Sequence, residues 1–234
     1  MQSPRSRNRL LASLHDADWR LIAPRLQSVE MLNRQVLEAA NQTIEHVYFP
    51  TQGIVSVVAK SADGQQIEAG VIGREGMTGA AIVMSNHRSP NEAVVQVTGE
   101  AERISADDLR TVLAQSEQMR QLAQRFVQVF MTQVAQTALA NGRAKIEERL
   151  ARWLLMAQDR LDDANLQLTH EFIALMLGVR RPGVTDAIND LEGKGLIRSA
   201  RGLVRIIDRD GLKAAAGGIY GVPEAEYDRL IGSA

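Results

Sequence analysis

A chain of 234 residues can form one large domain or two smaller ones, and 45% hydrophobic with 24% charged residues is typical of a soluble globular protein with buried cores. The absence of cysteine excludes disulfides, thiolate zinc sites, cysteine-ligated iron-sulfur clusters and cysteine nucleophiles. A formal net charge of -1 argues against a protein that binds nucleic acid over its whole surface.

The N-terminal region gives no sign of a targeting segment. His15 and Asp16 interrupt its apolar stretch, so it lacks the core of a signal peptide. No run of 18 apolar residues occurs anywhere in the sequence, so we expect no membrane span and a cytoplasmic location. The spacing of Leu14, Leu21 and Ile22 predicts short helices up to about residue 34.

The next part of the sequence, roughly residues 35–104, has the pattern of short strands. The stretches HVYFPTQGIVSVVAK, QQIEAGVIG and EAVVQVTGEAERI are rich in Val, Ile and aromatic residues and are separated by turn formers. The stretch SADGQQ places an Asp-Gly turn between two such runs, which is a strong hairpin signal. We therefore predict a small sandwich or barrel, and assign residues 1–104 to it and to the preceding helices.

Residues 105–142 have the apolar spacing of one long helix. Ser105 is a suitable N-cap, acids follow at Asp107 and Asp108, and Asn141-Gly142 is a natural stop. Such a helix is on the order of 50 Å long, and one small sheet domain should cover only its first turns. We expect it to pair with a second copy of the chain; the alternative is a helix lying across its own β domain. The predicted dimer interface comprises Met119, Leu122, Phe126, Val129 and Phe130.

Residues 143–213 predict a winged helix-turn-helix. The stretch GRAKIEERLARWLLMAQDRL is amphipathic, and LTHEFIALMLG has Thr169 as a plausible N-cap and Gly178 as a stop. A further helix then packs Val184, Ile188 and Leu191 inward, and LIRSARGLVRIID supplies two short strands for a wing. Residues 214–234 remain as a C-terminal tail.

Two adjacent arginines lie at the N-terminus of that further helix. Arg180 and Arg181 lie where the helix dipole is already positive, a position that favours acids, while Pro182 fits the first helical turn. An anionic partner removes the conflict, since the arginine fork matches a phosphate or a guanine edge. From Gly178 to Arg205 the sequence holds six cations against three acids. The alternative, a solvated surface pair, does not explain this local excess, so we predict DNA as the partner.

These residues resemble a known family. The stretch LTHEFIALMLGVRRPGVTDAINDLEGKGLI is similar to the winged helix-turn-helix of the Crp/Fnr family of bacterial transcription regulators, and ERLARWLL is similar to the helix that leads into it. The stretches VYFPTQGIVSVV and EAGVIGREGMTG resemble the family's cyclic-nucleotide-binding-type jelly roll. The resemblance extends from about Leu10 to Leu212.

The resemblance implies an α+β fold with an N-terminal sensory jelly roll, a long central dimerisation helix and a C-terminal winged helix-turn-helix. It implies a homodimeric, sequence-specific regulator that binds a pseudo-palindromic operator in double-stranded DNA through helix Arg181–Leu191 and contacts RNA polymerase. We assign DNA contacts to Arg180, Arg181, Pro182, Gly183, Thr185, Asp186, Asn189 and Arg201. Pro182 replaces a common glutamate of the family, so the operator preference of its best-known members is not carried over.

The sensory side departs from the family pattern. Met77 stands where cyclic-AMP-binding members have a glutamate for the ribose, and a thioether cannot replace that acceptor. Cyclic AMP is therefore not expected. Haem is not expected either, because the four histidines (His15, His46, His87 and His170) are scattered singly. We predict no cofactor and no metal, and take Glu75, Gly76, Met77, Thr78, Arg88 and Ser89 as the candidate effector pocket.

The sequence fits two other function classes less well than a regulator. An enzyme is not expected, because the sequence contains no nucleophile with a base, no P-loop, no GxGxxG and no metal-ligand spacing. A ligand-binding or adaptor dimer without a DNA role would leave the arginine pair and the wing unexplained.

Overall fold

The computed structural model describes residues 5–161, 165–200 and 202–232. The chain begins with two short helices, α1 (Arg9–Ala12) and α2 (Asp16–Ile22), and a 3-10 turn, η1 (Ala23–Arg25). Asn8 is fully buried and anchors this segment: its side chain caps α1 and donates to the Pro50 and Gly76 carbonyls at 2.9 and 2.8 Å. The helices end nine residues earlier than predicted, because residues 27–31 pair as a strand.

Two antiparallel sheets pack face to face and form the jelly roll. One has the order β1-β7-β3 and the other β2-β6-β4-β5. The strands are β1 (Gln27–Met31), β2 (Val36–Glu38), β3 (His46–Pro50), β4 (Ile54–Lys60), β5 (Gln66–Ile72), β6 (Glu92–Val97) and β7 (Gly99–Ser105), with helix α3 (Ala80–Val83) between β5 and β6. Gly64 has φ +86° between β4 and β5, which confirms the predicted Asp-Gly hairpin.

The predicted long helix is two helices, α4 (Ala106–Gln115) and α5 (Glu117–Arg143). The break is at Ser116, which is extended (φ -116°, ψ 109°) and caps α5 by accepting a hydrogen bond from the Met119 amide. Its hydroxyl also donates to Asp18 at 2.5 Å, so a contact with α2 stabilises the break. The prediction of one continuous helix was therefore wrong. Helix α5 alone has 27 residues and spans about 40 Å.

The five residues assigned to a dimer interface belong to the chain's own core. Met119, Leu122, Phe126 and Val129 are at most 7% exposed, and Phe130 is half-buried. The aromatic side chains of α5 pack beside the loop after β5: a Cβ on Gly76 would clash with the Phe126 ring. Helix α5 thus covers its own β domain, as the alternative interpretation held. This corrects the assignment, since buried side chains are not available to a second chain.

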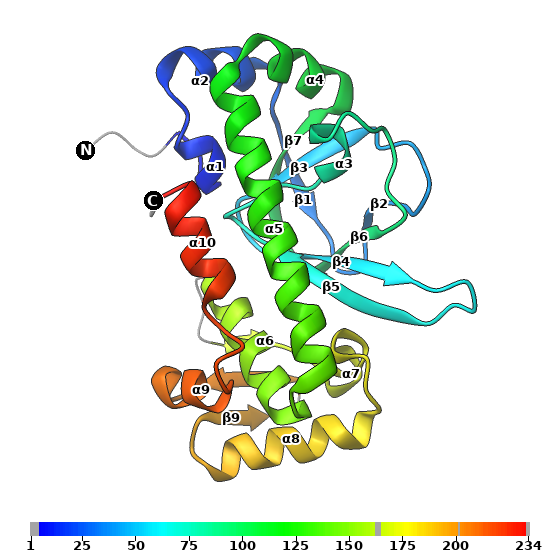
Figure 1. Cartoon of the computed structure of the whole chain (residues 1–234), viewed down its shortest axis with the longest axis vertical. Coiled ribbons are helices and arrows are strands. Elements are labelled where there is room, and N and C mark those ends of the chain that lie inside the picture. The colour runs from blue at the N-terminus through cyan, green and yellow to red at the C-terminus, as the bar shows by residue number, and fades with distance from the viewer. Residues whose placement is uncertain (1–4, 162–164, 201, 233–234) are drawn as a thin grey trace.

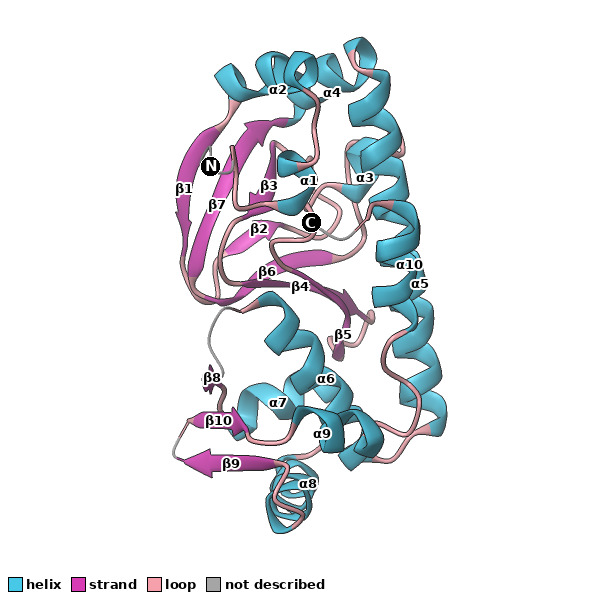
Figure 2. Ribbon diagram, turned by 90° about the vertical axis from the view of Figure 1, so that its left-hand side faces the viewer, coloured by secondary structure: helices cyan, strands magenta, loops and turns pink. Residues whose placement is uncertain are grey.

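A second core holds the C-terminal domain together. It is built from α6 (Ile146–Arg160), α7 (His170–Leu177), α8 (Arg181–Gly193) and a sheet of order β8-β10-β9, with β8 (Asn165–Gln167), β9 (Ile197–Ala200) and β10 (Leu203–Ile206). Ile54 and Val71 of the jelly roll are buried in the same cluster, so the two domains share part of this core. Figure 2 shows the small sheet below the jelly roll, with α8 at the far end of the molecule.

The C-terminal tail is helical. Helix α9 (Arg209–Ala215) packs on α6, and α10 (Val222–Leu230) runs beside α5 back toward the N-terminal helices (Figure 1). Tyr227 is 5% exposed, and Arg125 of α5 donates to the Leu230 carbonyl at 3.4 Å. The tail therefore connects the C-terminal domain to α5. Within the described residues, no helix has the length and hydropathy needed to cross a membrane.

Candidate nucleic-acid interface and sensory pocket

The turn between α7 and α8 has the geometry that the sequence predicts. Thr169 caps α7 by accepting from the Phe172 amide at 3.2 Å, and Gly178 ends it in the left-handed conformation (φ 59°, ψ 38°). Arg180 is extended and forms the N-cap of α8, so the first helical residues are Arg181 and Pro182. The missing N-H of Pro182 removes a donor that would have no intrahelical acceptor.

Helix α8 has one buried and one exposed face. Val184, Ile188 and Leu191 are at most 2% exposed and pack into the second core. The opposite face exposes five of the predicted DNA-contacting residues: Arg180, Arg181, Pro182, Asp186 and Asn189. Figure 1 shows α8 at the lower end of the molecule, away from the jelly roll, so this face can approach a large partner.

The arginine pair has no acidic partner among the described residues. No ion pair or side-chain hydrogen bond links Arg180 or Arg181 to any of them, and the N-cap position makes no side-chain cap. Two exposed arginines therefore lie at the positive end of a helix dipole. A polyanion stabilises this arrangement, because its charge offsets all three.

Two predicted contact residues face the protein. A Cβ on Gly183 would lie 3.0 Å from the Ile146 side chain, so this glycine allows α8 to pack closely on α6. The Thr185 hydroxyl donates to the Arg181 carbonyl at 3.3 Å and lies 3.2 Å from His170 Nδ1, which ties α8 to α7. Both positions are half-buried. The predicted wing residue Arg201 lies outside the described residues.

The wing adds two cations that the predicted set omits. Arg198 of β9 and Arg205 of β10 are exposed and directly opposite each other in the antiparallel register. Like charges in this relation repel, and an anion between them removes the repulsion. The sequence indicates these two arginines by the alternation of apolar and charged residues along each strand. Because Ile197, Val204 and Ile206 are buried, the arginines lie on the outer face.

The six candidate effector residues do not form one pocket. Met77, Thr78 and Ser89 line a cavity of about 80 Å³, which Phe126 and Phe130 of α5 close. Ligand pockets of roughly 300 Å³ or more hold small molecules, so this cavity is too small. Gly76 packs on the Phe126 ring and Arg88 is exposed. Glu75 pairs instead with Arg160 of α6, Oε1 to Nε 2.8 Å. The single-pocket assignment is thereby corrected.

A buried acid lines the same small cavity. Glu38 is 8% exposed and accepts a hydrogen bond from the Gly79 amide at 2.5 Å. Burial raises the pKa of Glu38, and hydrogen bonds from Thr78 and Gly79 lower it in part. The carboxylate thus fixes the loop before α3. No group of three or more His, Asp or Glu in the described part of the chain is placed to hold a metal.

Comparisons with known proteins match both halves of the chain. Residues 29–116 match the model of the cyclic nucleotide-binding domain, and residues 148–215 match that of the Crp-like helix-turn-helix domain. No curated protein matches the chain. The second match ends with α9, so helix α10 lies beyond it.

Solved structures share the fold at low sequence identity. A structure described as a transcriptional regulator of the Crp/Fnr family from Eubacterium rectale has a TM-score of 0.69 at 18% identity, covering 89% of this chain and 98% of that one. FixK2 from Bradyrhizobium japonicum has a TM-score of 0.67 at 16% identity, covering 81% and 96%. The c-di-GMP-responsive regulator CLP from Xanthomonas campestris has 0.67 at 13% identity, covering 82% and 99%.

Proposed function

The chain belongs to the Crp/Fnr family of DNA-binding transcription regulators, and from this premise we propose that it binds a pseudo-palindromic operator as a homodimer through helix Arg181–Leu191. The observation that carries the proposal is the exposed Arg180–Arg181 pair at the N-terminus of α8. This pair has no acidic partner among the described residues. We assign Arg181 to a guanine edge or a phosphate, and the wing arginines to further phosphate contacts. Its location is then the cytoplasm, where the DNA is.

We propose that the dimer forms through the exposed face of α5. Its exposed residues recur at intervals of three and four, the spacing of a coiled-coil seam. They are Gln121, Gln124, Gln128, Met131, Ala135 and Ala138. Met131 is 58% exposed, and Leu139 beside this row is 48% exposed. The small side chains of Ala135 and Ala138 allow two helices to approach closely at the end of α5 that leads into the DNA-binding domain.

We further propose that the jelly roll works without a cyclic nucleotide, a metal or another cofactor. Met77 is buried, and together with Phe126 and Phe130 it lines a cavity of about 80 Å³, which is too small for a cyclic nucleotide. The chain acts on transcription rather than as an enzyme, and RNA polymerase is its expected partner on DNA. No effector in the jelly roll is required for this function.

The test is an electrophoretic mobility-shift titration of the full chain against genomic fragments at moderate salt. A regulator shifts a small subset of fragments at concentrations far below those that shift bulk DNA. The alternative, an adaptor dimer without a DNA role, shifts none of them, and that result would overturn the proposal. The salt must be stated, because the affinity falls steeply with ionic strength.

A further inference from the structure

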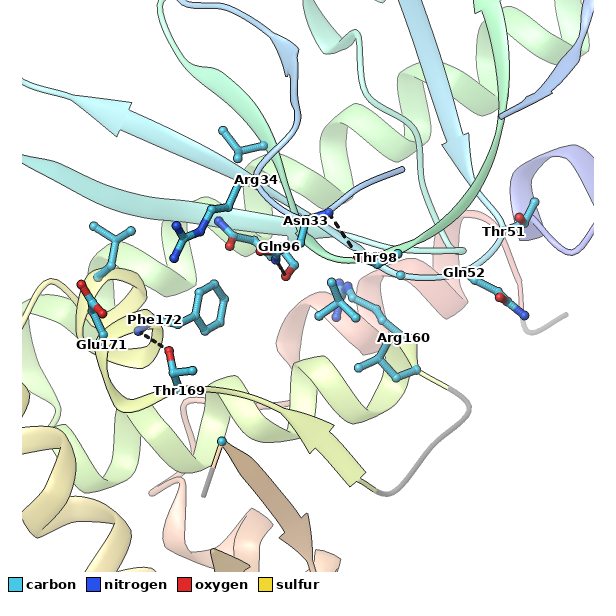
Figure 3. Close-up of a pocket in the computed structure, with 16 residues that line it drawn as sticks. Asn33, Arg34, Thr51, Gln52, Gln96, Thr98, Arg160, Thr169, Glu171 and Phe172 are labelled. Atoms are coloured by element: carbon cyan, nitrogen blue, oxygen red, sulfur yellow. Dashed lines mark hydrogen bonds between the residues drawn. The ribbon is translucent and has the colours of Figure 1, made fainter. Parts of the chain in front are cut away.

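A cleft of about 1360 Å³ separates the jelly roll from the DNA-binding domain. Its upper wall comes from the β1–β2 loop, the β3–β4 loop and the end of β6, and its lower wall from the end of α6 and from α7 (Figure 3). The volume exceeds the roughly 300–1,000 Å³ of most small-molecule pockets, so a ligand with several rings has room. None of the residues assigned to the candidate effector pocket lines it.

The upper wall is polar and carries one cation. Arg34 is exposed and has no acidic partner among the described residues, and Figure 3 shows its guanidinium on the side facing α7. Its φ is +68°, a left-handed conformation that favours glycine or asparagine, so the structure holds an arginine where the backbone resists one. The amide side chains of Gln52 and Gln96 lie on the same wall.

The lower wall exposes apolar side chains beside the charged residues Arg160 and Glu171. Leu175 is 46% exposed, and Phe172 and Leu161 are half-buried. The Phe172 ring packs edge-on against Trp153, with centroids 5.7 Å apart at 70°, so its position in the wall is fixed. An exposed leucine beside a fixed aromatic ring is a surface that favours an apolar ligand.

Arg160 and Glu171 are the other charged residues that line the cleft. The Nε of Arg160 lies 2.8 Å from Glu75, so this cation is already paired. Glu171 lies at the opposite wall and is beyond ion-pair distance of Arg34. A ligand in the cleft therefore meets one unpaired guanidinium above and, below, the apolar side chains of Phe172 and Leu175, with the Glu171 carboxylate on the same wall.

We infer that this cleft binds an organic anion, with its carboxylate, sulfonate or phosphate on Arg34 and an apolar body on Phe172 and Leu175. The two walls belong to different domains, so a bound ligand sets their relative position. That regulatory consequence rests on the proposed function, whereas the binding itself does not.

The test uses 8-anilinonaphthalene-1-sulfonate, which joins a sulfonate to aromatic rings and fluoresces when bound to an apolar surface. The full chain is titrated without DNA, so a failure of DNA binding leaves this result unchanged. We expect one saturable site per chain. Arg34→Gln removes the charge and keeps a polar side chain, and should weaken binding at least tenfold. Leu175→Asn should weaken it by a similar factor.

The neutral probe N-phenyl-1-naphthylamine separates the two contributions. Its affinity should stay within twofold in Arg34→Gln and fall in Leu175→Asn. Arg110→Gln, an exposed arginine on α4, is the matched control and should change neither probe. Both cleft side chains are exposed, so the variants should fold, and circular dichroism checks this. Equal binding of the sulfonate by wild type and Arg34→Gln, or no saturable binding, would overturn the inference.

Discussion

The indole Nε1 of Trp153 donates a hydrogen bond to the carboxylate of Glu68 at 2.7 Å, joining α6 of the DNA-binding domain to β5 of the jelly roll. Glu68 is 5% exposed and also accepts from the Ser56 hydroxyl of β4. Its burial raises its pKa to about 7, while the hydrogen bonds and the nearby Arg152 and Arg160 lower it in part. One titratable carboxyl thus lies in the contact between the two domains.

Glu68 should make the stability of the protein depend on pH. Its pKa is about 7 in the folded chain and near the ordinary 4.5 in the unfolded chain, so the folded state binds more protons between these values. Stability therefore falls by roughly 3 kcal/mol as pH rises from about 4.5 to 7, and this group has no further effect above that range. Glu68→Gln keeps an acceptor for Trp153 and removes this contribution.

The measurement is urea unfolding of wild type and Glu68→Gln at pH values from 4.5 to 8. As pH rises from about 4.5 to 7, the unfolding free energy of wild type should fall relative to that of Glu68→Gln. A difference that stays constant with pH would show that Glu68 does not titrate there.

Replacing Gly178 should destabilise the turn between α7 and α8. Alanine at φ +59° costs about 1–2 kcal/mol, and its Cβ would lie 2.9 Å from Ile67 Cδ1 of the β4–β5 hairpin. Gly193→Ala is the matched control, because that residue is helical and an added Cβ meets nothing within 4 Å. We expect thermal unfolding to show a lower Tm for Gly178→Ala and an unchanged or higher Tm for Gly193→Ala. Equal shifts in the two variants would contradict the turn geometry.

Tyr227 should anchor α10 through its ring rather than its hydroxyl. The side chain is buried, and its hydroxyl has no hydrogen-bond partner among the described residues. Tyr227→Ala should cost about 3–5 kcal/mol, as for other buried aromatic residues, and Tyr227→Phe should be neutral or slightly stabilising. Chemical denaturation of both variants checks this. A large loss in Tyr227→Phe would indicate a hydroxyl contact that the structure does not contain.

The exposed row on α5 predicts how the dimer can be disrupted. Ala135→Glu places like charges against each other in a helix pair and should shift the protein to monomers in sedimentation equilibrium. Met84→Glu is the control, because Met84 is 63% exposed beyond α3 and lies outside the row. If Ala135→Glu sediments like wild type, the dimer uses another surface.

Local signals made the DNA-binding half predictable. Thr169, Gly178 and the arginines before Pro182 each act through neighbouring residues, and their caps and turn are confirmed. The same holds for the hairpin turn at Gly64. These elements depend on backbone preferences that a short stretch of sequence contains.

The features that could not be predicted from the sequence depend on contacts between residues far apart in the chain. The break at Ser116 depends on Asp18, which lies 98 residues earlier, and periodicity alone continues through it. Glu68 and Trp153 are 85 residues apart, so nothing local marks that carboxyl as buried. The apolar stripe of α5 correctly indicates a buried face, but the identity of its cover, the chain's own sheets, depends on the tertiary fold.

The central claim is that the arginines at the N-terminus of α8 bind DNA. Fluorescence anisotropy with a fragment selected by the mobility-shift titration, at several salt concentrations, tests it most directly. Arg181→Ala should weaken binding by roughly 1–3 kcal/mol and relax the preference at one base pair, while Arg110→Ala on α4 should bind like wild type. Unchanged affinity and unchanged base preference in Arg181→Ala would contradict the account.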